Sequence, residues 1–144
     1  MIDDTGIFQI AIAIAPLTDP SRQREIAGVM VDTGAVYNWV PEDVLNELGI
    51  SPHRVERFET AEGRVLERDI GFALLYAANR STPTIVVFAR PGDMVLLGAF
   101  GLEGLNMRVD LARQELVPAG PVPAAEAASQ RYRLSGPRRT AGIS

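Results

Sequence analysis

The chain has 144 residues, of which 47% are hydrophobic and 22% charged, so a single domain with a buried core is expected. The formal net charge of −4 argues against nucleic acid or an anionic membrane as the main partner. The chain has no cysteine and no lysine, which excludes disulfides, thiolate nucleophiles, Schiff-base chemistry and the lysine of a P-loop, and leaves carboxylates as the main catalytic groups.

The first elements expected along the chain are two strands. Residues 10–14 are rich in isoleucine and predict a buried strand. Residues 16–22 hold two prolines, an Asp and a Ser, and predict a turn. A second strand is predicted at residues 25–31, and its apolar end runs directly into the sequence Asp32-Thr33-Gly34-Ala35.

A short helix and a hairpin are expected next. Residues 40–49 predict the helix, because Pro41 suits the first helical position and Gly49 suits the C-terminal cap. Residues 54–75 predict the hairpin, with Gly63 as the natural turn residue between its two strands.

The second half of the domain is expected to complete a mostly β fold. Residues 84–89 predict a central strand, because their run of apolar residues leaves neither face polar. An apolar run at residues 94–97 ends at Gly98. The other expected elements are turns at 79–83 and 91–93, one helical turn at 102–105, and closing strands at 106–110 and 115–118.

The composition changes at residue 119. Residues 119–144 are rich in Ala, Pro, Gly and Ser and carry a net charge of +3, against −7 for residues 1–118. We therefore expect a domain over residues 1–118 followed by a flexible tail, with an arm that contacts a partner as the alternative. The acidic start and the lack of a long apolar stretch predict a cytoplasmic protein that does not associate with membranes.

Asp32 is the leading catalytic candidate. An apolar strand delivers its carboxyl group to a fixed point, Thr33 can lock the loop with its hydroxyl, and Gly34 lets main-chain N–H groups approach the carboxylate. The same tripeptide at Asp4-Thr5-Gly6 has no apolar strand before it, so it is interpreted as a capped turn.

Together with Val95-Leu96-Leu97-Gly98, this order of motifs resembles the retropepsin-like, or retroviral-type, aspartic peptidases, and especially their bacterial single-domain members. The resemblance covers about residues 6–118. It implies an all-β, single-lobe acid-protease barrel with one or two short helices, active as a homodimer without cofactor or metal. Asp32 would be the catalytic carboxylate, Thr33 would bond across the dimer axis, and Gly34 would lie close to the substrate.

The resemblance also implies supporting and substrate-binding residues. The segment 96–98 would cross behind the catalytic loop, and residues 59–66 would form a flap that closes over a bound peptide. Viral enzymes carry an Asp where this chain has Val36, and that Asp helps to bind the substrate backbone. Binding of the substrate backbone must therefore differ in this chain. The candidate substrate-binding residues are Ala35, Glu62, Gly63 and Arg64.

The predicted mechanism requires two copies of the chain. Hydrolysis by this route activates a water between two carboxylates that share one proton. One chain offers one Asp in a usable context, and symmetric pairing supplies it twice. The function predicted is therefore an aspartic endopeptidase acting on peptides or proteins.

Other interpretations remain beside this one. The same fold could serve as a non-catalytic peptide-binding or dimerisation module. The glycines at 98, 101 and 104 prompt a nucleotide-binding enzyme, although their spacing departs from the dinucleotide fingerprint. Tyr37 and Trp39 fit the cleft as well as they fit packing in the core or in an interface. His53, the only histidine, is interpreted as a surface turn residue. A zinc site normally needs three or four good ligands, and a single histidine beside carboxylates is a weak basis for one.

Overall fold

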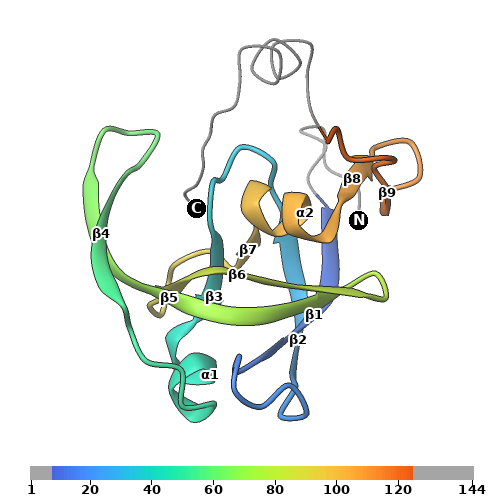
Figure 1. Cartoon of the computed structure of the whole chain (residues 1–144). Helices are drawn as coiled ribbons and strands as arrows, with labels where there is room; N and C mark the ends of the chain where they lie inside the picture. The colour runs from blue at the N-terminus through green and yellow to red at the C-terminus, as the bar shows by residue number, and fades with distance from the viewer. Residues whose placement is uncertain (1–7, 125–144) are drawn as a thin grey trace, which may run out of the picture.

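The structure, a computed structural model, describes residues 8–124, which form nine strands and two short helices (Figure 1). The elements are β1 (Phe8–Ala15), β2 (Arg24–Val31), β3 (Asn38–Pro41), α1 (Glu42–Glu47), β4 (Arg54–Glu59), β5 (Val65–Ala77), β6 (Arg80–Ala89), β7 (Leu96–Leu97), α2 (Ala99–Leu105), β8 (Met107–Asp110) and β9 (Glu115–Pro118).

Seven strands form one curled sheet in the order β1-β2-β7-β3-β6-β5-β4, and β1 also pairs with β5. The strands β8 and β9 form a separate antiparallel pair at the end of the domain. The predicted class, a mostly β single lobe with one or two short helices, is confirmed.

The helix predicted at residues 40–49 is shorter than expected, because its first part is a strand. Pro41 has φ −52° and ψ 132°, an extended conformation, and is the last residue of β3. Helix α1 begins after it, so the prediction that Pro41 occupies the first helical position is wrong. Gly49 follows the C-cap residue with φ 73°, the left-handed conformation that favours glycine after a helix.

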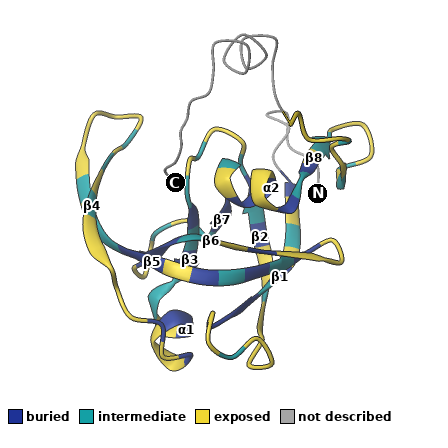
Figure 2. Ribbon diagram, in the orientation of Figure 1, coloured by how far each residue is buried: buried dark blue, intermediate teal, exposed yellow. Residues whose placement is uncertain are grey.

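The core lies inside the curl of the sheet, and buried residues of α1 and α2 contribute to it (Figure 2). Isoleucine, valine and leucine side chains from β1, β2, β5 and β6 are buried there. The strand predicted at residues 84–89 is central, as expected: β6 lies between β3 and β5, and its last four residues are buried.

The hairpin of β4 and β5 extends away from this core, on the left of Figure 1, and most of β4 is exposed in Figure 2. Its strands pair from Arg54 with Ile70 to Glu59 with Val65. The turn is closed by hydrogen bonds from Thr60 N–H to the Arg64 carbonyl (2.8 Å) and from Gly63 N–H to the Thr60 carbonyl (2.9 Å). Gly63 has φ 86°, which confirms it as the turn residue.

The domain boundary predicted at residue 118 remains a prediction. Ala119 N–H donates to the Asn106 carbonyl (3.0 Å), and Asn106 Nδ2 donates to the Gly120 carbonyl (2.9 Å), so the chain is still bound to the end of α2 there. The predicted flexible tail beyond residue 124, and the Asp4-Thr5-Gly6 turn, lie outside the described residues. Within residues 8–124, no helix has the length and apolar character needed to cross a membrane.

Candidate active site

The end of β2 is held in place by β7, which lies between β2 and β3. Met30 N–H donates to the Val95 carbonyl (3.1 Å), and Asp32 N–H donates to the Leu97 carbonyl (2.9 Å). These two bonds fix the point at which the chain leaves the sheet. The side chain of Asp32 therefore starts from a rigid strand end and not from a mobile loop.

The loop that follows, residues 32–37, is the catalytic loop expected from the resemblance, and it bends back on the Asp32 side chain. Ala35 N–H donates to the Asp32 carbonyl (3.1 Å), and Gly34 N–H donates to Asp32 Oδ1 (2.9 Å). A Cβ atom on Gly34 would lie 3.2 Å from the same oxygen, tighter than an ordinary contact. Glycine thus lets the main chain approach the carboxylate.

Gly98 and the start of α2 support the loop from behind. Ala99 N–H donates to the Ala35 carbonyl (2.8 Å), and Phe100 N–H donates to the Val36 carbonyl (3.0 Å). Gly98 N–H donates to Asn38 Oδ1 (2.9 Å). Two consecutive N–H groups of this segment therefore hold the catalytic loop, and a third, that of Gly98, binds Asn38 at the start of β3.

Asn38 is the polar residue of this support that the sequence analysis missed. Its side chain is fully buried, and its Nδ2 donates to Thr84 Oγ1 and to the Ile85 carbonyl, both at 3.0 Å. Its amide thus joins β6 to Gly98, with donor and acceptor both satisfied, as a buried amide requires. The only signal in the sequence was a polar residue beside an apolar strand.

A cleft of about 710 Å³ opens between the catalytic loop, the β4–β5 hairpin and the loop at residues 90–95. Of the predicted site residues, Asp32, Gly34, Ala35 and Arg64 line it. Thr33, Glu62 and Gly63 are exposed and do not line the cleft. The remaining lining residues are Val36, Tyr37, Trp39, Phe58, Glu59, Thr60, Ala61, Leu66, Gly92, Asp93, Met94 and Leu96.

Aromatic side chains link the catalytic loop to the hairpin. The ring centroids of Trp39 and Phe58 are 5.0 Å apart, and those of Tyr37 and Phe58 are 6.0 Å apart, within the range of favourable aromatic pairs. Both Tyr37 and Trp39 are half-buried and line the cleft. The structure therefore places both side chains in the cleft and not in the core, while interface packing stays a prediction.

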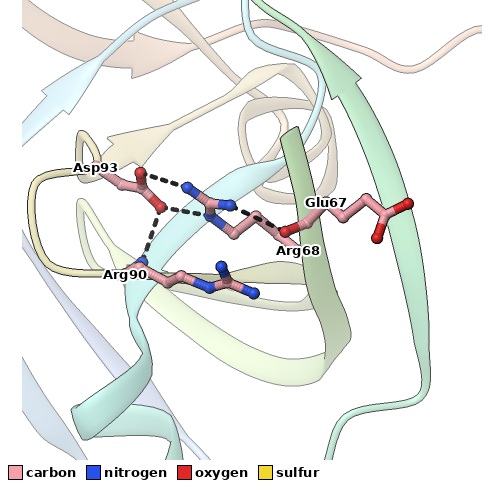
Figure 3. A network of polar contacts seen from close by, with 4 residues as sticks. All are labelled: Glu67, Arg68, Arg90 and Asp93. Carbon is pink, nitrogen blue, oxygen red and sulfur yellow. Dashed lines mark hydrogen bonds and ion pairs between the residues drawn. The ribbon is translucent and has the colours of Figure 1, made fainter. Parts of the chain in front are cut away.

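Arg68 of β5 and Asp93 of the loop before β7 form an ion pair at the edge of the cleft (Figure 3). Arg68 Nε donates to Asp93 Oδ2 (2.7 Å), and its Nη2 donates to Asp93 Oδ1 (2.9 Å). The side chains are only 11% and 13% exposed. Hydrogen bonding to Arg68 lowers the pKa of the Asp93 carboxyl below its ordinary value, and the same bond raises the pKa of Arg68.

The Arg68–Asp93 pair should stabilise the fold in a pH-dependent way. The pKa of Asp93 is lower in the folded than in the unfolded protein. The pair's contribution to the free energy of unfolding is therefore fully present above the unfolded-state pKa of about 3.9, and it is lost as the pH falls through the folded-state pKa. We expect Asp93→Asn to lower the free energy of unfolding by about 3 kcal/mol at pH 7. Urea unfolding between pH 7 and pH 3 should show the difference in unfolding free energy between the two proteins beginning to shrink as the pH falls below about 3.9. A difference that is constant over this range would contradict the assignment.

Two further candidates can be placed. His53 is exposed in a connecting segment, as predicted, with its ring centroid 5.0 Å from that of Phe72, and it does not line the cleft. Among residues 8–124, no three side chains of His, Cys, Asp or Glu are grouped closely enough to hold a metal ion.

Comparison with known proteins gives matches among solved structures and none among family models or curated proteins. No protein-family model matches the chain, and no curated protein matches it. Among solved structures, 57 chains match. One is the solution structure of the protease of simian foamy virus (mac), with 19% sequence identity over 67% of this chain and 92% of that chain and a TM-score of 0.45. A likeness at this TM-score adds nothing to the assignment of the site.

Proposed function

We propose that this protein is an aspartic endopeptidase in which two copies of the chain each contribute Asp32 to one active site. The observation that carries the proposal is the Asp32 carboxylate at a rigid strand end, beside a cleft and bonded by Gly34 N–H. In this site Asp32 is the catalytic residue, Gly34 orients its carboxylate, and Thr33 contacts the partner copy. No cofactor, metal or nucleic acid takes part.

The chemistry requires a second carboxylate beside Asp32. Asp93 and Glu59 are the other acidic residues of the cleft. Asp93 is bound on both oxygens by Arg68, and Glu59 lies exposed on the hairpin. A second copy related by a two-fold axis supplies the same carboxylate in the same setting. One carboxylate of the pair then acts as base toward water while the other, protonated, polarises the peptide carbonyl.

The cleft suits an extended peptide. Its apolar wall includes Trp39, Phe58 and Met94, and Arg64 adds a positive charge from the hairpin turn. Because residues 59–66 project from the core, this flap could close over a chain lying between itself and the catalytic loop. Ala35 and Arg64 are the substrate-binding residues favoured by this arrangement, while Glu62 and Gly63 would reach the substrate only on closure.

The experiment is a peptidase assay over a range of enzyme concentrations. We expect cleavage of denatured casein, inhibition by a transition-state analogue of aspartic peptidases, and a specific activity that rises with enzyme concentration through a dimerisation curve. Sedimentation velocity on the same samples should give a midpoint at the same concentration.

The alternative function gives a different result. A non-catalytic peptide-binding or dimerisation module would dimerise or bind casein without cleaving it at any pH between 3 and 8. Specific activity that is independent of concentration, in a protein that stays monomeric, would overturn the two-chain proposal.

A further inference from the structure

The Arg68–Asp93 pair joins two walls of the cleft that are distant in sequence. Arg68 lies on the hairpin strand β5, two residues after Leu66, so both side chains are on the same face of the strand. Leu66 lines the cleft. Asp93 belongs to the loop on the other side, and it lines the cleft together with Gly92 and Met94. The pair therefore ties the base of the hairpin to this loop.

The Asp93 end of the pair is itself rigid. Arg90 N–H donates to Asp93 Oδ2 (2.8 Å), and Asp93 N–H donates to the Arg90 carbonyl (2.9 Å), which closes a tight turn (Figure 3). Two residues later, the Val95 carbonyl accepts the bond from Met30 on β2. The hairpin base is thus linked to β2, the strand that ends directly before Asp32, through the Asp93 carboxylate, the main chain of residues 93–95 and the bond between Met30 and Val95.

The bidentate geometry distinguishes this pair from the other ion pairs of the described chain. Two parallel N–H···O bonds between planar groups fix orientation as well as distance. Arg54 and Glu56 on the adjacent strand β4 also form an ion pair, but their side chains are 47% and 36% exposed. Exposed pairs of that kind contribute little. The two pairs offer a comparison between a buried and an exposed arginine on one hairpin.

We propose that Arg68 and Asp93 are positioning residues that preset the width of the cleft and hold Met94 against an apolar side chain of the bound peptide. This inference rests on the proposed peptidase function. Met94 is 53% exposed in the cleft wall, next to Asp93. Without the ion pair, the hairpin and the loop must be ordered by the substrate itself, which weakens binding. The hydrogen bonds that hold Asp32 do not involve either residue, so the chemical step is retained.

The test compares Arg68→Met, Asp93→Asn and the double variant with the control Arg54→Met. We expect each of the first three to raise KM about tenfold, equivalent to about 1.4 kcal/mol, and to change kcat less than about twofold. The double variant should be no worse than the more affected single variant, because the two residues act through each other. Arg54→Met should match the wild-type protein. Assays are run above the dimerisation midpoint, so that association does not enter KM.

Hydrogen–deuterium exchange provides a second readout that does not need activity. The amides of residues 90–95 should exchange faster in Arg68→Met than in the wild-type protein, and those of β1 should not change. A purely structural role would lower the active fraction, and therefore kcat, at unchanged KM; that result would overturn the inference. Unchanged KM in an active enzyme refutes the inference alone, whereas a wild-type protein without peptidase activity refutes the proposed function and removes the inference with it.

Discussion

Replacing Asp32 by asparagine is expected to lower peptidase activity by at least about a thousandfold while leaving the fold intact. The amide has the same shape as the carboxyl group, and its oxygen can still accept the 2.9 Å bond from Gly34 N–H. It cannot take a proton from water at any pH at which the protein folds. Activity is measured as kcat/KM on a peptide substrate, and folding by urea unfolding followed through Trp39, the single tryptophan.

The chain supplies a matched control for this variant. Asp4 precedes Thr5 and Gly6 in an identical tripeptide, and Asp4→Asn should retain full activity. Mixed samples give a further test of the two-chain site. Adding an excess of Asp32→Asn to a fixed amount of wild-type protein should suppress cleavage as inactive mixed dimers form. Full activity of Asp32→Asn would show that another group performs the hydrolysis.

The parts of the site that could be predicted from the sequence are those that depend on short, continuous sequence patterns. An apolar strand running into Asp32, a glycine turn at Gly63 and a second apolar run ending at Gly98 each depend on neighbours in the chain. The observed strand β2, the hairpin and β7 all lie where these patterns placed them, within a few residues. Local propensity and tertiary structure agree at these points.

The parts that could not be predicted depend on distant partners. Asn38 binds groups 46, 47 and 60 residues away, and Arg68 binds a carboxylate 25 residues away. Contacts between residues so far apart leave no periodic pattern in a single sequence from which they could be predicted. Strand β3 was missed for a related reason: it has four residues, too few to show alternation, and its parallel pairing with β6 is set by the sheet and not by its own sequence.

Thr33 illustrates a third case, in which one chain is not enough. Its side chain is exposed and does not line the cleft. A bond across the dimer axis requires atoms of a second copy, so the role proposed for Thr33 is tested only by the assembly. We expect the specific activity of Thr33→Ala to depend on protein concentration, with a dimerisation midpoint at a higher concentration than that of the wild-type protein.

Replacing Gly98 by alanine is the second change with a large expected effect. The backbone of Gly98 has φ −102° and ψ −169°, which any residue can adopt, so its requirement for glycine is one of space and not of conformation. A Cβ atom there would lie 2.8 Å from the Ala35 carbonyl oxygen and well inside contact distance of the Tyr37 carbonyl oxygen. Both are backbone atoms of the catalytic loop, and no side-chain rotation can move them away.

The added methyl group must therefore push the catalytic loop away from β7. We expect Gly98→Ala to lower the free energy of unfolding by about 3 kcal/mol, at the upper end for an overpacked site. Any folded protein should also lose most of its peptidase activity, because the bonds from Ala99 and Phe100 set the position of the loop, and the bond from Gly98 holds Asn38 directly after it. Urea midpoints and kcat/KM on the same samples give both numbers.

Gly104 in α2 provides the contrasting case. A Cβ atom there would also collide, but with atoms of the Thr82 side chain and not with backbone. Removing that side chain beyond its own Cβ, in the double variant Gly104→Ala/Thr82→Ala, should restore most of the stability lost in Gly104→Ala. No equivalent second substitution exists for Gly98, since its neighbours are carbonyl oxygens that every residue carries. If Gly98→Ala unfolds at the same urea concentration as the wild-type protein, the close packing of β7 against the catalytic loop is not present in solution.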